Sequence, residues 1–339
     1  MTRSPEPLLS IEDLRVSFAI RSGFLRRTKA EVRGVDGVSF SVMQGKTLGI
    51  VGESGCGKST TARAIIGLET PNSGAISFAG ERIELATPKR RRQLARHIQM
   101  IYQDPFASLN PRKTVEQIIG EGWLVHPDLV PESERKAETA LLMRRVGLDP
   151  ALSNRFPHQF SGGQRQRIGI ARALALRPRL LVCDEPVSAL DVSVQAQTLN
   201  LLAELQHELG LTYVFIAHDL SVVRHVSDTI AVMYLGRIVE TGPIGPIYAR
   251  PAHPYTLALM SAAPVSRPWA VSRPSRIVLK GELPSPLAPP PGCRFHTRCW
   301  MARARCRIEE PKLREVAGRK TACHFAEEVV AEAAPIGTP

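Results

Sequence analysis

Gly52-Glu53-Ser54-Gly55-Cys56-Gly57-Lys58-Ser59 fits the phosphate-loop pattern G-x-x-x-x-G-K-[S/T] without a mismatch. The apolar run before it predicts a strand, and the residues after it predict a helix, which is the setting that the pattern requires. Glycines let backbone N–H groups turn toward an anion, and a helix N-terminus adds unpaired N–H groups and a positive dipole end. The stretch therefore predicts a nucleoside triphosphate site. The residues expected around the phosphates are Gly52, Ser54, Gly55, Cys56, Gly57, Lys58, Ser59 and Thr60.

The bulk composition is that of a globular chain. With 339 residues, of which 43% are hydrophobic, it is long enough for one large domain and a smaller one. No run of 18 apolar residues predicts a membrane span, and the segment from Met1 to Glu6 lacks the apolar stretch of a secretory signal. We therefore expect the chain in the cytosol unless a partner ties it to a membrane.

The net charge of +12 is concentrated in three basic clusters, at residues 21–33, 89–92 and 294–320. Nucleic-acid binding, attraction to an anionic membrane face and ordinary solvated surface charge are all compatible with these clusters. Charge alone leaves the three interpretations open.

The N-terminal residues predict strands that could cover a nucleotide base. Residues 8–18 alternate apolar and polar, residues 35–42 predict a second strand, and the Arg-rich segment 21–33 between them is expected to be an exposed loop. Phe18 could stack on the adenine, with Phe24 as a second choice. The alternative is that Phe18 is simply a core residue.

Three later apolar runs each end at a polar side chain that could take part in chemistry. The first leads to Gln103, the second to Asp184 and Glu185, and the third to His218. Segments with helical spacing separate these runs, and this alternation predicts a parallel sheet covered on both faces. Because ligands of such sheets bind at the carboxyl ends of the strands, we expect these residues and Lys58 at one edge of the sheet.

The order of the motifs resembles that of the nucleotide-binding subunit of an ABC transporter over roughly the first 235 residues. Ser161-Gly162-Gly163-Gln164 is similar to the signature sequence of that family, and Ser188-Ala189-Leu190-Asp191 is similar to its D-loop. Gln103 is similar to the Q-loop glutamine and His218 to the switch histidine. Phe160 stands where the family often has leucine, which is a minor departure.

A closer resemblance covers nearly the whole chain. The stretches 102–111, 253–256 and 292–324 are similar to the ATPases of oligopeptide and dipeptide importers. Cys56 and the stretch 184–197 favour the F-type of the two ATPases that such importers usually carry. The resemblance implies import of peptides, although some relatives handle nickel or other small solutes.

The expected fold is α/β: a RecA-like P-loop core with a parallel sheet, an N-terminal antiparallel β subdomain, an α-helical insert and a small Cys-rich C-terminal extension. The expected boundaries are 8–263 for the nucleotide-binding domain with its insert at about 110–157, 264–291 for a Pro-rich linker, 292–325 for the Cys-rich extension and 326–339 for a flexible tail.

The resemblance assigns roles to the residues of the ATP site. Lys58 would reach the β- and γ-phosphates, and Ser59, Gln103 and Asp184 would serve Mg²⁺, with Asp184 acting through its water shell. Glu185 would orient and deprotonate the attacking water, since hydrolysis of a phosphoryl group needs one aligned nucleophile. His218 would contact the γ-phosphate and hold Glu185, and Gln103 would also relay the state of the γ-phosphate to the helical insert. For the two carboxylates, a capping or salt-bridge role is the alternative.

The resemblance also implies a set of partner chains. Ser161, Gly162, Gly163 and Gln164, together with Asp191, would serve the ATP bound to a second ATPase subunit, expected to be a paralogue. Two transmembrane permease subunits and, indirectly, an extracytoplasmic substrate-binding protein complete the expected assembly at the cytoplasmic face of the inner membrane. A soluble ABC-type ATPase acting on nucleic acid and a regulatory subunit that binds ATP without hydrolysing it are the rival hypotheses, and no nucleic acid is expected.

Four of the six cysteines fall close together near the C-terminus: Cys293, Cys299, Cys306 and Cys323. In a cytosolic chain such density suggests a metal before disulfides. The C-x₂-C spacing common in zinc sites is absent, and zinc, a [4Fe–4S] cluster and free thiols all remain open on spacing alone. Resemblance to the importer extension favours the [4Fe–4S] cluster. His296 and His324 are possible substitute ligands, and Cys183 is expected in the core of its strand.

Overall fold

The computed structural model describes residues 6–22, 27–262 and 277–332. Its main sheet has the strand order β11-β12-β10-β9-β3-β8-β7-β6, in which β9, β3, β8, β7 and β6 are parallel and the other three are antiparallel. The strands of this sheet are β3 (Thr47–Val51), β6 (Ile98–Ile101), β7 (Leu180–Asp184), β8 (Thr212–Ala217), β9 (Thr229–Tyr234), β10 (Arg237–Pro243), β11 (Arg314–Val316) and β12 (Arg319–Thr321).

The central strands are buried on both faces. All residues of β3, β7 and β8 are buried, so these strands are continuous apolar runs rather than alternating ones. Because successive side chains of a strand point to opposite faces, Leu181 and Cys183 pack in one core, while Leu180 and Val182 pack in the other. The prediction that Cys183 is a core residue is confirmed.

Helices cover the two faces of the main sheet. Ile168 of α7 and Leu202 of α8 join one core, whereas Ala62 and Ile65 of α1 join the other. The helices are α1 (Lys58–Ile65), α2 (Pro88–Ala95), α3 (Pro105–Ser108), α4 (Val115–Ile119), α5 (Glu121–Val125), α6 (Arg135–Arg145), α7 (Gly162–Leu174), α8 (Val192–Leu209), α9 (Leu220–Val226), α10 (Ile244–Ala249), α11 (Pro254–Ala262), α12 (Ala304–Ile308) and α13 (Ala326–Glu332), with short 3₁₀ turns at Ile83–Leu85, Glu132–Glu134, Pro150–Leu152 and Pro157–Gln159.

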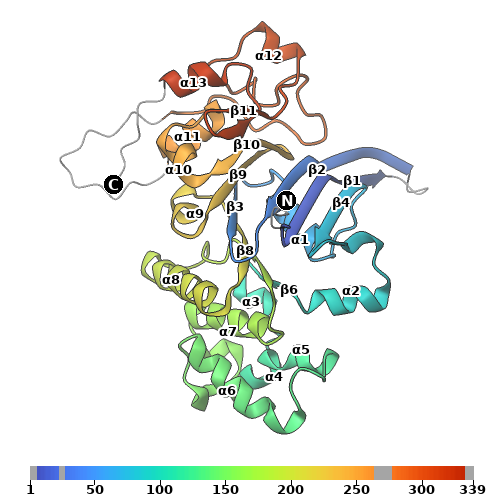
Figure 1. Ribbon diagram of the computed structural model, residues 1–339, viewed down its shortest axis with the longest axis vertical. Coiled ribbons are helices and arrows are strands. Elements are labelled where there is room, and N and C mark those ends of the chain that lie inside the picture. Colours follow the sequence, from blue (N-terminus) through green and yellow to red (C-terminus); the bar gives the residue numbers. More distant parts are fainter. Residues whose placement is uncertain (1–5, 23–26, 263–276, 333–339) are drawn as a thin grey trace, which may run out of the picture.

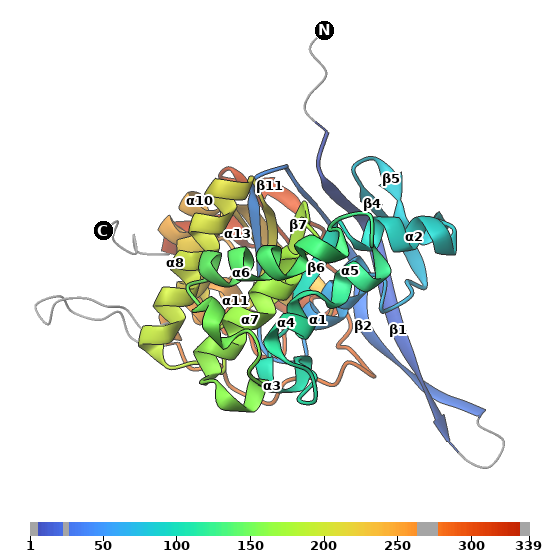
Figure 2. The same cartoon turned by 90° about the horizontal axis from the view of Figure 1, so that it is seen from below.

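A second, antiparallel sheet is built from the N-terminal part of the chain, in the order β2-β1-β4-β5. It packs on the same core as α1 through side chains such as Leu9, Val38 and Ile76. In Figure 2 its two long strands, β1 and β2, run along one side of the molecule. Its strands are β1 (Leu9–Ser22), β2 (Arg27–Val42), β4 (Ser73–Phe78) and β5 (Glu81–Arg82).

The α/β fold with a parallel core and an antiparallel N-terminal sheet is therefore confirmed. One detail is wrong: the Arg-rich segment 21–33 is not simply a loop. Strands β1 and β2 continue into it and pair as far as Ser22 and Arg27, because an antiparallel ladder satisfies the backbone groups there. Residues 23–26, and with them Phe24, lie outside the described residues.

The helical and C-terminal parts lie at opposite ends of the molecule (Figure 1). Helices α4, α5 and α6 occupy the stretch where the insert is expected, at one end. At the other end, the hairpin β11–β12 adds to the main sheet, because β12 pairs with β10. Among the described residues, no helix has both the length and the apolar character needed to span a membrane.

The C-terminal boundaries differ from the expectation. Of the proposed linker, residues 263–276 lie outside the described part, and residues 277–291 contain neither helix nor strand. The prediction that the chain is a flexible tail from residue 326 onward is wrong for its first part, which forms α13. Ala326 is fully buried with Ala252 and Val316, so the apolar side of this short helix has a packing partner that the local sequence does not reveal.

Candidate nucleotide site

The phosphate loop connects β3 to α1 with the backbone that its glycines permit. Gly55 and Gly57 have φ angles of 77° and 106°, a region that side chains with a Cβ rarely adopt. The buried Lys58 ammonium donates hydrogen bonds to the carbonyls of Gly52 at 2.8 Å and Glu53 at 3.1 Å. Lys58 therefore lies against the loop, with its cationic end where the phosphates of a nucleotide are expected.

Cys56 takes part in the loop through its backbone. Its side chain is buried in the core shared by α1 and the N-terminal sheet, and burial raises the pKa of the thiol. Its carbonyl accepts a hydrogen bond from Gly236 N–H at 2.9 Å. The side chain is therefore a packing group that ties the loop to the sheet.

Ser59 and Asp184 form the oxygen-rich side of the site. The Ser59 hydroxyl donates to Asp184 Oδ1 at 3.0 Å, across the gap between the start of α1 and the end of β7. Burial raises the pKa of Asp184, its hydrogen bond from Ser59 opposes that shift, and the neighbouring Glu185 adds to it. A hydroxyl and a carboxylate are ligands that Mg²⁺ accepts, so the pair suits the predicted magnesium position.

Glu185 is the meeting point of the predicted catalytic residues. Its Oε2 accepts a hydrogen bond from Gln103 Nε2 at 3.0 Å and lies 3.4 Å from His218 Nδ1, while its Oε1 lies 3.9 Å from Lys58 Nζ. Its φ of 45° is unusual for a residue with a side chain and turns the chain sharply after β7. The ends of β3, β6 and β8 thus bring Lys58, Gln103 and His218 to the carboxylate of Glu185 at the end of β7.

Phe18 lies beside the phosphate loop and not in the core. Its side chain is 38% exposed, which argues against the alternative of a plain core residue. A Cβ placed on Gly34 would lie 3.2 Å from Phe18 Cε2 and 3.4 Å from Thr60 Cγ2, so the two side chains flank the same glycine. The ring is accessible near the start of α1, where a base attached to the bound phosphates could reach it.

The signature stretch lies at the N-terminus of α7 and is satisfied by its own residues. Gln164 N–H donates to Ser161 Oγ at 3.3 Å, and Ser161 N–H donates to Gln164 Oε1 at 3.0 Å, a capping box. Gly163 leaves little room, since a Cβ there would lie 2.5 Å from Val194 of α8. Asp191, at the start of α8, is exposed. Ser161 is exposed, whereas Gly162, Gly163 and Gln164 are half-buried, so the signature stretch is partly accessible on the described chain.

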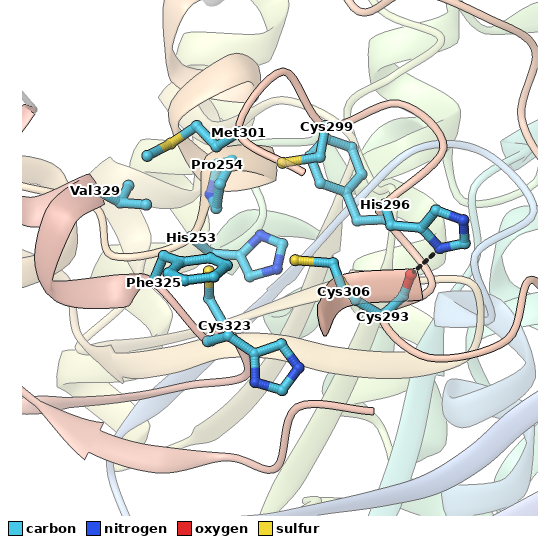
Figure 3. Close-up of a pocket in the computed structure, with 12 residues that line it drawn as sticks. His253, Pro254, Cys293, His296, Cys299, Met301, Cys306, Cys323, Phe325 and Val329 are labelled. Atoms are coloured by element: carbon cyan, nitrogen blue, oxygen red, sulfur yellow. Dashed lines mark hydrogen bonds between the residues drawn. The ribbon is translucent and has the colours of Figure 1, made fainter. Parts of the chain in front are cut away.

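The four C-terminal cysteines line one pocket (Figure 3). Each is a free thiol, and burial raises the pKa of Cys293 and Cys323 to about 11 and that of Cys299 to about 12. Within the described ranges, however, no group of three or more His, Cys, Asp or Glu side chains is arranged to hold a metal ion. The described residues therefore do not support the predicted metal centre, either as a zinc site or as a [4Fe–4S] cluster.

The two histidines considered as substitute ligands are bonded to backbone carbonyls. His296 Nδ1 lies 2.8 Å from Cys293 O, and His324 Nε2 lies 2.9 Å from Glu309 O. Both rings line the pocket of the cysteines, but these ring nitrogens are engaged elsewhere.

Two residues that were not predicted for the site, Arg298 and Tyr255, contact the phosphate loop. Arg298 of the C-terminal extension forms a bidentate ion pair with Glu53, and the Tyr255 hydroxyl accepts a hydrogen bond from Glu53 N–H. Arg298 stands 245 positions from its partner, and no periodic or motif signal links the two. Only the path of the folded chain reveals the contact.

Comparison with known families and proteins agrees with this geometry. Residues 35–188 match the family model described as ABC transporter, and residues 239–306 match the one described as oligopeptide/dipeptide transporter, C-terminal region. The chain is 54% identical to the oligopeptide transport ATP-binding protein AppF of Bacillus subtilis, over 94% of this chain and 98% of that protein. It is 50% identical to the di/tripeptide transport ATP-binding protein DppF of Pseudomonas aeruginosa, over 95% and 99%.

Solved structures share the fold at lower identity. cbiO1 from Clostridium perfringens, part of the ABC transporter complex cbiONQ, superposes with a TM-score of 0.61 at 28% identity, over 72% of this chain and 91% of that one. The dimeric bacterial ABC transporter cassette MJ0796 gives a TM-score of 0.62 at 24% identity, over 70% and 98%, and supports the fold alone.

Proposed function

This chain belongs to the ABC transporter family, among the ATP-binding proteins of oligopeptide and dipeptide transporters, and we propose that it is the subunit whose ATP hydrolysis powers a peptide importer. ABC transporter ATP-binding proteins hydrolyse ATP to drive transport. The observation that carries the proposal is the convergence of Lys58, Gln103 and His218 on Glu185, beside the Ser59–Asp184 pair.

In this proposal Lys58 neutralises charge on the β- and γ-phosphates, and Phe18 stacks on the adenine. Ser59, Gln103 and Asp184 would hold Mg²⁺, which would neutralise charge on the phosphates when bound. Glu185 accepts a proton from the water that attacks the γ-phosphate, with the carboxylate held by the Gln103 hydrogen bond. His218 positions Glu185 and the water from the end of β8.

The exposure of Ser161 and Asp191 supports action on a neighbouring subunit. Ser161, Gly162, Gly163 and Gln164 present the N-terminus of the 13-residue helix α7, whose backbone N–H groups and dipole favour an anion. We place them, with Asp191, against the ATP of a second ATPase subunit, a paralogue of this chain. The two ATPase subunits would close over two ATP molecules and separate after hydrolysis. This movement would push the helical insert against two permease subunits at the cytoplasmic face of the membrane. The permease subunits would receive cargo from a substrate-binding protein.

The test of this assembly is to isolate the chain from membranes in mild detergent and identify the proteins that accompany it. Two hydrophobic subunits and a second ATPase, together with phosphate release from Mg-ATP, are the expected result. Competition by peptides and by nickel salts for uptake in cells then separates a peptide importer from one for a small solute. Salt-sensitive DNA binding without any membrane fraction would instead support the rival ATPase acting on nucleic acid.

We also propose that the four pocket-lining cysteines hold a [4Fe–4S] cluster. Four thiols line one pocket, and four is the number of thiolate ligands that a [4Fe–4S] cluster takes. Metal ligation requires deprotonated thiolates, so binding of the cluster would release the thiol protons. Brown colour, visible absorbance and equal iron and sulfide in anaerobically purified protein are expected; stoichiometric zinc without colour would contradict the cluster.

A further inference from the structure

The C-terminal extension reaches into the nucleotide site at Glu53, the second residue of the phosphate loop. Arg298 Nη1 donates to Glu53 Oε2 at 2.7 Å, and Nη2 donates to Oε1 at 3.2 Å. The backbone N–H of the same residue donates to the Tyr255 hydroxyl at 2.8 Å. Lys58 Nζ donates to its carbonyl at 3.1 Å. One loop residue is therefore held at its side chain, its N–H and its carbonyl.

The Arg298–Glu53 pair is shielded from solvent. The Arg298 side chain is only 10% exposed, whereas Arg305, which forms a bidentate pair with Glu309 elsewhere in the extension, is 56% exposed. Bidentate arginine–carboxylate pairs fix geometry as well as charge, and partial burial reduces the screening that weakens surface pairs. This pair can therefore fix where the loop lies relative to the extension.

Tyr255 is braced by aromatic rings from both parts of the molecule. Its fully buried ring packs on Tyr234, at the end of β9, with centroids 4.8 Å apart, and on Phe295 of the extension at 5.4 Å. Phe295 stands three residues before Arg298, and Cys299 directly follows Arg298. The two contacts with Glu53 thus belong to one rigid cluster that includes the cysteine-bearing segment.

We propose that the C-terminal extension positions the phosphate loop for Mg-ATP, with Arg298 and Tyr255 as positioning residues that act through Glu53. The proposal rests on the proposed ATPase function of the same site. Neither side chain contacts Glu185 or His218 in the hydrogen bonds and ion pairs of the described residues, so their effect is on nucleotide binding and not on the hydrolytic step.

The test compares the full-length wild-type chain with Arg298→Met, Glu53→Gln, the double variant and Tyr255→Phe. Binding of a fluorescent ATP analogue with Mg²⁺ gives Kd, and phosphate release gives KM and kcat. Arg298→Met is expected to raise Kd and KM about fivefold, because a charge-assisted pair is lost, and to change kcat less than about twofold. The double variant should bind no more weakly than Arg298→Met, since both changes break the same pair.

Arg305→Met is the matched control, because it removes an arginine from a bidentate pair in the same extension that does not touch the loop. It should bind like the wild type. If Arg298→Met lowers the melting temperature, Arg298→Lys is used in its place. Lysine keeps the charge but loses the bidentate geometry, so Kd and KM should rise in the same direction by a smaller factor. Tyr255→Phe removes only the hydroxyl and should raise Kd about threefold.

The outcomes separate the two proposals. If the wild-type chain fails to bind Mg-ATP, the proposed function is wrong. If the wild type binds and both the arginine and tyrosine variants bind equally well, only the positioning role is wrong. Loss of kcat at unchanged KM, or additive losses in the double variant, would also overturn the role assigned to Arg298.

Discussion

The nucleotide site and the attachment of the C-terminal extension are built in different ways. Around Glu185, the functional side chains stand at the ends of parallel strands whose backbones are paired along their whole length. The extension joins the same sheet through only two residue pairs between β10 and β12. Its other links include individual ion pairs to distant residues, Arg319 with Glu240, Arg298 with Glu53 and Arg294 with Asp36.

This difference determines what a single substitution does. At the nucleotide site the sheet holds the backbone, so a changed side chain alters chemistry while the fold survives. At the attachment, an individual buried side chain is itself part of what holds the extension in place, so its loss alters structure first. Four predictions test this contrast, beginning with the largest expected effect.

Glu185→Gln should lower kcat for ATP hydrolysis by about a hundredfold or more while Mg-ATP still binds, because the amide keeps the shape but cannot accept the proton of the attacking water. The closed pair of ATPase subunits should accumulate. The measurements are phosphate release, nucleotide Kd and subunit association by size-exclusion chromatography with Mg-ATP.

Glu204→Gln, on the exposed side of α8, is the matched control and should behave as the wild type. Unchanged turnover in Glu185→Gln would show that Glu185 has no catalytic role. The contrast between the nucleotide site and the attachment of the extension would then fail on the side of the nucleotide site.

Arg319→Met should loosen the extension without abolishing nucleotide binding. Arg319 and Glu240 are both buried 3.9 Å apart, and Arg319 also donates to the carbonyls of Pro246 and Arg250. Removing one partner of this buried pair should cost about 3–5 kcal/mol, because the other group loses its counter-charge. Hydrogen exchange in β10 and β12 should rise, while exchange in β3 and β8 stays slow.

The double variant Arg319→Met/Glu240→Gln should recover part of that cost, since no buried charge is then left alone. Equal protection of β10 and β12 in the wild type and Arg319→Met would show that the ion pair does not hold the extension.

Stability of the extension should also fall as pH rises. Burial raises the pKa of Glu240 to about 7 from its ordinary value of 4.5, only partly opposed by its hydrogen bonds and by Arg319. The folded state then binds more protons than the unfolded state between these two values, so the stabilisation is complete below pH 4.5 and is lost as pH approaches 7. The loss between pH 5 and 7 is about 2 kcal/mol.

Unfolding by urea at several pH values measures this slope in the wild type and in Glu240→Gln. Glu240→Gln has no carboxyl at this position, so its free energy of unfolding should fall by about 2 kcal/mol less between pH 5 and 7 than that of the wild type. Identical slopes would mean that Glu240 does not titrate in this range.

Phe18→Ala should have the smallest effect, about a fivefold rise in Kd for Mg-ATP at nearly constant kcat, because stacking on a partly exposed ring contributes modestly. Phe18→Trp preserves a stacking surface and should bind like the wild type. If the affinity for inorganic triphosphate, which has no base, fell by the same factor, the loss would be due to the phosphate loop and not to base stacking.

Particular residues show which features of the site could be predicted from the sequence. The phosphate loop, the Asp184–Glu185 pair and His218 were predictable because each is marked by a local motif or by its place after an apolar strand. Their meeting was predictable because the ends of adjacent parallel strands share one edge. Phe18 could be proposed but not separated from a core residue, since exposure depends on what packs around it.

The rest depended on partners far along the chain. The Arg-rich segment is part of two strands because β1 and β2 pair with each other there. Helix α13 is stabilised because Ala326 packs against Ala252 and Val316. The sequence by itself determined the nucleotide chemistry, because backbone N–H geometry and strand ends follow from neighbouring residues. Only the tertiary structure decided how the extension contacts the phosphate loop. No local sequence feature specifies that Arg298 pairs with Glu53 in the folded chain.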